Sequence, residues 1–122
     1  MMGDPSPAVC RELGLAVAAV AREREVLLVA STDLSHYHQY DQAKHLDEHT
    51  LKYILDFDPE GLADALARDQ AHACGGASVA AVMIAARELG ANQAHLVKYA
   101  NSGDVWDDKS QVVGYAAVVV TR

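Results

Sequence analysis

Two apolar runs of strand length limit what this chain can fold into. Residues 25–32 read EVLLVAST and residues 112–121 read VVGYAAVVVT, and neither run alternates between apolar and polar positions. Runs that are apolar on both faces suit strands in the centre of a sheet that helices cover. The run AHLVKYA, over residues 94–100, predicts a further strand. The chain therefore needs a buried sheet.

The segments around these runs have the periodicity of amphipathic helices. Apolar residues at helical spacing predict helices over residues 7–22, 41–55, 58–69 and 78–89. In chain order this gives a helix, a strand, three helices and two strands. That order predicts a layered α/β domain.

Composition excludes some classes of function. The chain has 122 residues, enough for one domain at most, and 17 acidic against 10 basic residues give it a net charge of −7. A chain this acidic, with no cluster of basic residues, is not expected to bind nucleic acid. No apolar run approaches the roughly 18 residues of a membrane span. The two cysteines make no disulfide framework, so we expect a reducing cytoplasm.

Asp33 and His36 directly follow the apolar run over residues 25–32. Ligands of open α/β sheets tend to bind where strands end, and an acid and an imidazole three residues apart can meet across one turn. They could be metal ligands or an acid/base pair. The alternative interpretation is that Asp33 caps the next turn and His36 makes a hydrogen bond within the loop.

Cys74 precedes two glycines and a predicted helix. A thiol at a helix N-terminus faces partial positive charge, which favours the thiolate, a ligand for soft metals. Glycine neighbours let a ligand approach the backbone closely. The alternative is a small buried hydrophobic residue, because cysteine is among the most buried residue types.

The remaining histidines are weaker candidates. His45 and His49 form half of a zinc-binding HExxH pattern, but Leu46 stands where the glutamate is needed, which favours a solvated helix face. His72 lies two residues before Cys74 and could support a site there.

Several segments together resemble the Memo family, whose members are also called protein B of the AmmeMemoRadiSam system. The segments are STDLSHYHQYDQAKHLDEHTL, FDPEGLADAL, ACGG, VKYANSGDV and VVGYAAVVV, in family order over essentially the whole chain. Memo proteins are similar in fold to class III extradiol dioxygenases. The resemblance implies a partial three-layer α/β sandwich around a mixed sheet. Residues 1–122 would be a single partial domain, the C-terminal half of a Memo-like domain.

The resemblance also implies a metal pocket. In the family, two histidines of the N-terminal half and a cysteine of the C-terminal half make the pocket, and an aspartate and a further histidine line it. By resemblance Cys74 is a metal ligand, and Asp33 and His36 are pocket residues that serve as ligands or in catalysis. The implied cofactor is a mononuclear iron or copper ion. One departure is GGAS after Cys74, where the family often has a larger residue and a proline.

The leading functional hypothesis is therefore a fragment of a non-haem, metal-dependent redox enzyme of unknown substrate. The alternative is a non-catalytic protein that uses the same pocket to bind metal or a peptide. Because the first two histidine ligands are expected outside this chain, we expect it to need an N-terminal half as partner, or else to self-associate.

Overall fold

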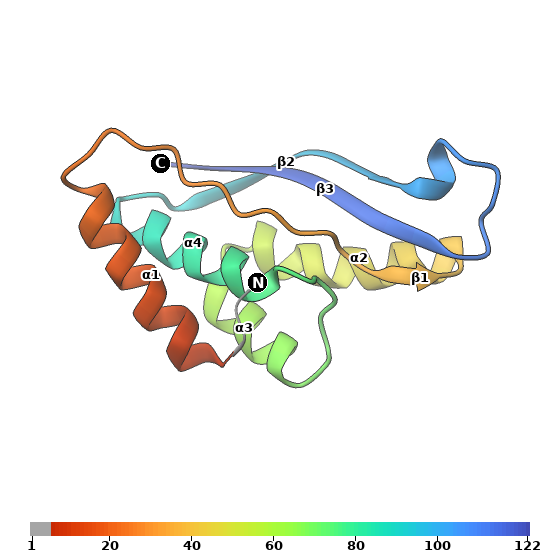
Figure 1. Ribbon diagram of the computed structural model, residues 1–122, viewed down its shortest axis with the longest axis horizontal. Helices are drawn as coiled ribbons and strands as arrows, with labels where there is room; N and C mark the ends of the chain where they lie inside the picture. Colours follow the sequence, from red (N-terminus) through yellow and green to blue (C-terminus); the bar gives the residue numbers. More distant parts are fainter. Residues whose placement is uncertain (1–5) are drawn as a thin grey trace.

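The computed structural model describes residues 6–122 and has the expected α/β class (Figure 1). In chain order its elements are α1 (Pro7–Ala21), β1 (His36–His38), α2 (Tyr40–Leu55), α3 (Pro59–Ala67), α4 (Gly76–Glu88), β2 (Gln93–Asn101), the 3-10 helix η1 (Ser102–Asp104) and β3 (Val112–Thr121). None of the helices in the described part of the chain is long and apolar enough to cross a membrane.

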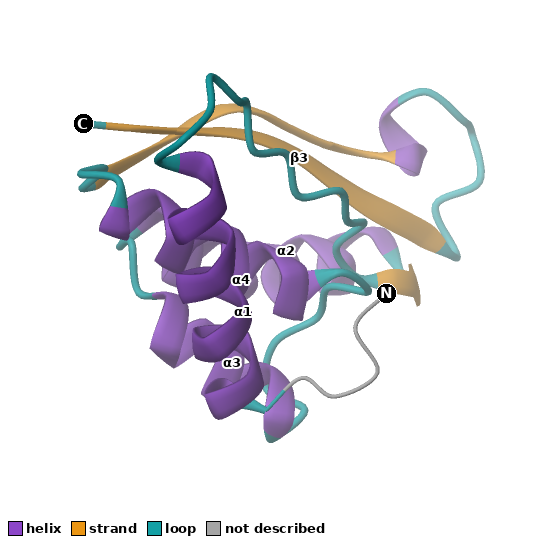
Figure 2. Cartoon of the chain, turned by 60° about the vertical axis from the view of Figure 1, so that its left-hand side comes forward, coloured by secondary structure: helices purple, strands orange, loops and turns teal. Residues whose placement is uncertain are grey.

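The strands form one antiparallel sheet in the order β1-β3-β2. β2 and β3 pair from Gln93↔Thr121 to Asn101↔Gly114, with a bulge between Leu96 and Lys98. Helices α2 and α4 contact the sheet, and α1 and α3 pack behind them (Figures 1 and 2). Within residues 6–122 the helices thus cover one face of the sheet, which is one side of the expected sandwich.

Helix boundaries follow from capping residues. The Ser6 side chain accepts a hydrogen bond from the Val9 N–H, with proline at the first helical position of α1. Asp58 accepts from the Gly61 N–H in the same way at the start of α3 (2.8 Å). The prediction for α4 began two residues late, because Gly76 and Ala77 already lie in the helix.

The prediction of a central strand over residues 25–32 is wrong. This segment is extended and runs beside β3, but no ladder joins it to the sheet (Figure 1). Pairing begins only where Leu34 N–H donates to the Gly114 carbonyl (2.9 Å) and Gly114 N–H donates to the Ser35 carbonyl (3.0 Å). The short strand β1 follows there, in a stretch for which no strand was predicted. Among the described residues no backbone hydrogen bond joins residues 25–32 to β3, and both border one apolar cavity that α2 and α4 also line.

The core lies between the helices. α1 and α4 approach closely because Gly14 has no side chain: a Cβ there would lie 2.7 Å from both the Ala81 carbonyl oxygen and Ile84 Cβ. Cys10 is fully buried in this interface, so it packs as a small apolar residue. The largest apolar side chains of the core are Leu62, Met83 and Ile84.

A buried carboxylate joins the helices to the sheet near the loop that carries Asp33. Asp47 on α2 is fully buried and accepts hydrogen bonds from the Ser35 N–H (2.8 Å) and the Tyr99 hydroxyl (2.7 Å). Burial, together with this bond to Asp47, raises the pKa of Tyr99. Gly114 of β3 passes directly over the carboxylate, where a Cβ would clash with it. Asp47 therefore holds Ser35 in place, between Asp33 and His36.

Candidate metal centre

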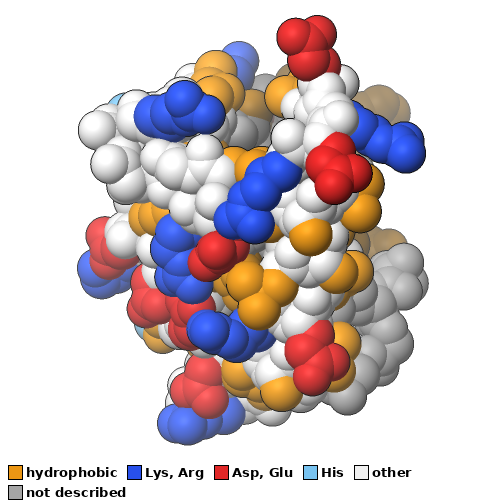
Figure 3. All heavy atoms as spheres, turned by 90° about the vertical axis from the view of Figure 1, so that its left-hand side faces the viewer, with side chains coloured by type: hydrophobic (Ala, Val, Ile, Leu, Met, Phe, Trp, Pro, Cys, Tyr) orange, Lys and Arg blue, Asp and Glu red, His pale blue; other side chains and the backbone are white. Residues whose placement is uncertain are grey.

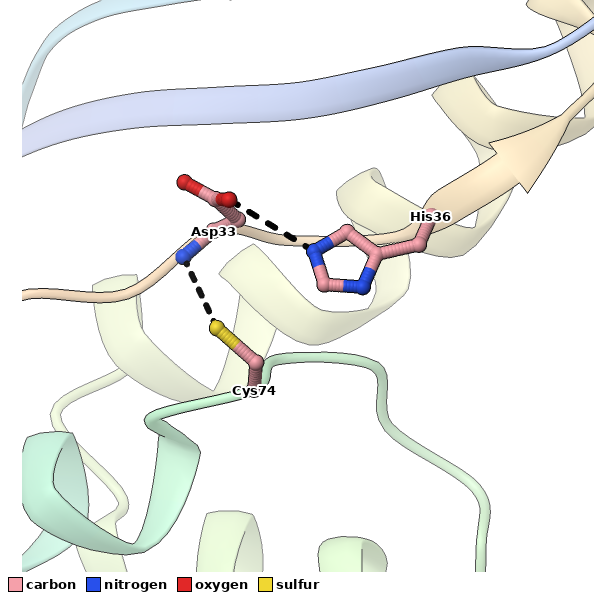
Figure 4. A group of neighbouring side chains, drawn as sticks. All are labelled: Asp33, His36 and Cys74. Atoms are coloured by element: carbon pink, nitrogen blue, oxygen red, sulfur yellow. Dashed lines mark hydrogen bonds and ion pairs between the residues drawn. The ribbon is translucent and has the colours of Figure 1, made fainter. Parts of the chain in front are cut away.

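Asp33, His36 and Cys74 come together although Cys74 lies 41 residues after Asp33. One ligand atom from each residue lies within 4.8 Å of the other two (Figure 4). The loop before β1 supplies Asp33, β1 supplies His36, and the loop before α4 supplies Cys74. The prediction that these three side chains converge is confirmed.

Backbone contacts between the two loops bring Cys74 to Asp33. The Cys74 N–H donates to the Asp33 carbonyl (3.3 Å), and the Asp33 N–H donates to Cys74 Sγ (3.4 Å). One residue further along, the Gly75 N–H donates to Thr32 Oγ1 (2.8 Å). A Cβ on Gly75 would lie 2.5 Å from the Ser31 carbonyl oxygen, so this approach requires glycine. The glycine after the cysteine therefore serves to close the two loops together.

The Asp33 carboxylate and the His36 imidazole face each other across one turn. Asp33 Oδ2 and His36 Nε2 are 3.6 Å apart, and their side chains are 47% and 38% exposed. An ion pair this accessible stabilises a fold by less than about 1 kcal/mol. A contribution this small to stability does not explain why Asp33 and His36 lie together. Both side chains are accessible to a ligand or substrate.

The three donors lie close to the spacing that one transition-metal ion requires. Metal bonds to nitrogen, oxygen and sulfur are roughly 2.0–2.3 Å long, so two ligands of one ion lie within about 4.6 Å of each other. The Asp33–His36 distance of 3.6 Å meets this limit, and the 4.8 Å that encloses all three ligand atoms lies slightly above it. A carboxylate, an imidazole and a thiol together suit a borderline or soft metal.

A polar cavity of about 400 Å³ opens beside the three residues. His36 and Cys74 line it, and so do His38 and His72, whose rings are 5.9 Å apart in an edge-to-face arrangement. From the sequence His72 was expected to be able to support a site near Cys74, whereas His38 was not singled out. Their proximity to His36 and Cys74 along the chain was the only signal. The cavity gives a small molecule access to the candidate centre.

The other histidine candidates lie elsewhere. His45 is exposed on α2, 3.9 Å from Glu48, and the His49 ring contacts the edge of Tyr53. This agrees with the interpretation of a solvated helix face. The two cysteines also differ in exposure, since Cys10 is buried and Cys74 is exposed.

Comparison with known proteins identifies similar sequences over nearly the whole chain. A family model described as Memo-like protein matches residues 1–119. A MEMO1 family protein of Methanosarcina mazei is 41% identical over 121 residues, which cover 98% of this chain and 45% of the relative. One from Methanopyrus kandleri is 42% identical, covering 92% and 40%. A third, from Nitrosopumilus maritimus, is 38% identical, covering 97% and 43%. The chain thus spans less than half the length of these relatives.

Proposed function

The chain belongs to the Memo-like protein family, and from that premise we propose that it carries part of the mononuclear metal centre of a non-haem, metal-dependent redox enzyme. The observation that supports this proposal is the meeting of a carboxylate, an imidazole and a thiol within 4.8 Å. Three hydrogen bonds, one between backbones and two from a backbone N–H to a side chain, hold together the segments that carry Asp33 and Cys74.

Each residue has a role that follows from its donor atom. Cys74 binds the metal through Sγ, and Asp33 and His36 either complete its coordination or act beside it. The proposed metal is iron or copper. A non-haem iron ion with open coordination positions would supply dioxygen activation. A thiolate ligand such as Cys74 would shift the metal preference of the site toward softer ions such as copper(I). When the pair acts as acid and base, Asp33 orients the imidazole and His36 Nε2 takes or gives a proton in the adjoining cavity.

The centre needs ligands from outside this chain. A catalytic metal site normally has three protein ligands. This chain supplies the Cys74 thiol, and Asp33 and His36 would not complete the set if they serve in proton transfer instead. The chain also spans less than half of its relatives. We therefore propose that the remaining part of the family's domain, supplied as a partner, completes the site. We further propose the reducing cytoplasm as its location, because two cysteines make no disulfide framework.

A metal titration tests this proposal. Ferrous iron and copper(I) are titrated calorimetrically into the chain alone and into the chain mixed with the unmatched part of the Methanosarcina mazei relative. We expect weak binding by the chain alone and tight binding of one ion by the mixture. Cys74→Ser should abolish tight binding, whereas the matched change Cys10→Ser, in the α1–α4 interface, should not. Tight binding by the mixture that survives Cys74→Ser would contradict the proposed centre.

A second candidate is a non-catalytic protein that binds metal or a peptide through the same residues. The exposure of all three side chains favours it, because catalytic centres commonly exclude water. Oxygen consumption by an iron-loaded, full-length relative distinguishes the two candidates. Turnover supports the enzyme, and one bound ion without turnover supports the binding protein.

A further inference from the structure

A pair of histidines outside the Asp33–His36–Cys74 group lies in the polar cavity beside it. The ring centres of His38 and His72 are 5.9 Å apart, and both residues line the cavity of about 400 Å³. β1 carries His38, and the loop before α4 carries His72. Within residues 6–122 neither imidazole makes a hydrogen bond or an ion pair. Their ring nitrogens are therefore available to a ligand.

The main chain holds both histidines in place. The His72 N–H donates to Thr50 Oγ1 on α2 (2.9 Å), and Thr50 is fully buried. His38 pairs with Val112 of β3 beyond a bulge, and Tyr37 at that bulge has a φ of 62°. A left-handed backbone at a bulky residue is strained and persists only where the surrounding structure enforces it. The fold therefore sets the spacing of the two imidazoles.

This spacing suits one metal ion between the two rings. A bond from a metal to an imidazole nitrogen is about 2.0–2.1 Å long and each nitrogen lies about 1.1 Å from its ring centre, so two imidazoles on one ion have ring centres at most about 6.4 Å apart. The observed 5.9 Å lies within that limit. A plain edge-to-face contact between two aromatic rings covers a similar range, about 4.5–7 Å. The groups around the rings distinguish the two interpretations.

Groups that bind metals line the cavity, and basic side chains do not. Besides the two histidines, the lining residues include His36, Cys74 and Asp69. Imidazole, thiol and carboxylate are ligands that borderline divalent ions accept. Lys and Arg side chains lie among acidic ones on the face that Figure 3 shows, but none of them lines this cavity. A bound cation thus meets no like charge from the lining residues, which favours a metal ion over a plain ring contact.

We propose that His38 and His72 bind a second metal ion, a borderline divalent ion such as zinc, through their ring nitrogens. Water completes the coordination of this ion, because two imidazoles leave positions open and zinc takes four ligands. The ion lies in the same cavity as the Asp33–His36–Cys74 group but uses none of its three side chains, so this site does not rest on the proposed centre. With only two protein ligands, it binds its ion more weakly than a closed site does.

Zinc titration tests this site in a chain that lacks the proposed centre. The background chain carries Cys74→Ser, which removes the thiol of that centre, and His45→Ala, which removes the exposed pair of His45 and His49 on α2. Calorimetry should show one bound zinc ion. In nuclear magnetic resonance spectra of the labelled chain, the imidazole signals of His38 and His72 should shift on zinc addition, whereas the signal of His95, exposed on β2, should not.

Further substitutions in this background identify the ligands. His38→Ala and His72→Ala should each weaken zinc binding by about tenfold or more, because each removes one of two protein ligands. His95→Ala is the matched control and should leave the affinity within about twofold, since His95 does not line the cavity. His72→Ala keeps the backbone N–H that bonds to Thr50, and circular dichroism verifies that each variant is folded.

Three results would overturn the proposal. They are a background chain that binds no zinc, zinc binding that leaves the His38 and His72 signals unshifted, and an unchanged affinity in either His38→Ala or His72→Ala. The last would leave only a ring contact between the two residues. If a variant does not fold, the signal shifts still decide, because they need no change at either histidine. Failure of the proposed centre in its own titration leaves these outcomes unaffected, because its thiol is absent from the background chain.

Discussion

Replacing Asp47 by alanine should destabilise the fold far more than an ordinary helix substitution. The Ser35 N–H would be buried without an acceptor, which costs about 1–3 kcal/mol, and the Tyr99 hydroxyl would lose a bond of about 1.5–3 kcal/mol. Tyr99 is partly exposed and regains some hydration, so we expect a total loss of about 3–4 kcal/mol of unfolding free energy. That is a large share of the 5–15 kcal/mol typical of a domain.

Urea denaturation followed by circular dichroism measures this loss. The matched control is Glu48→Ala at the next position of α2, where the side chain is 59% exposed, and it should change stability by no more than about 0.5 kcal/mol. In a double-mutant cycle with Tyr99→Phe, the coupling energy should exceed about 0.5 kcal/mol, because the two side chains share one hydrogen bond. A loss below about 1 kcal/mol for Asp47→Ala would refute the argument that this carboxylate joins α2 to the sheet.

Other predictions concern the site and its surroundings. In chelator, Cys74 should be alkylated faster than Cys10 at neutral pH, because Cys74 is exposed and Cys10 is fully buried; mass spectrometry of timed samples gives both rates. Gly75→Ala should cost about 1–3 kcal/mol in urea denaturation, because its Cβ would meet the facing backbone. Hydrogen bonding to Arg87 lowers the pKa of Glu60 below its ordinary 4.5, so its contribution to stability is present above that pH and is lost as the pH falls through the lowered value. Stability should therefore decline less on acidification in Glu60→Gln than in the unaltered chain.

Local signals predicted most of the elements. β3 occupies the predicted residues 112–121, and α3 begins at the proline that follows the Asp58 cap. Such elements were predictable because burial and capping depend on residues close in sequence. The segment 25–32 has an equally apolar sequence but is not a strand, because a strand also needs a partner for its backbone groups. Apolar character alone could not reveal whether that partner was present.

The site was predictable for a different reason. Asp33 and Cys74 were placed together by the resemblance to the Memo family, which implies one shared pocket. Their distance depends on backbone bonds between two loops, which no periodicity encodes. The contact between the His38 and His72 rings could not be predicted for the same reason, since it exists only in three dimensions.

The joining of the two loops through their main chains bears on how this site can change over evolutionary time. Main-chain N–H and carbonyl groups are present whatever side chain a residue carries, so the contact between Asp33 and the Cys74 N–H survives a change of donor at position 33. Gly75 is the constrained position, because its lack of a side chain permits the approach. A carboxylate, amide or imidazole at position 33 can therefore be exchanged for another donor while the spacing of the two loops stays the same.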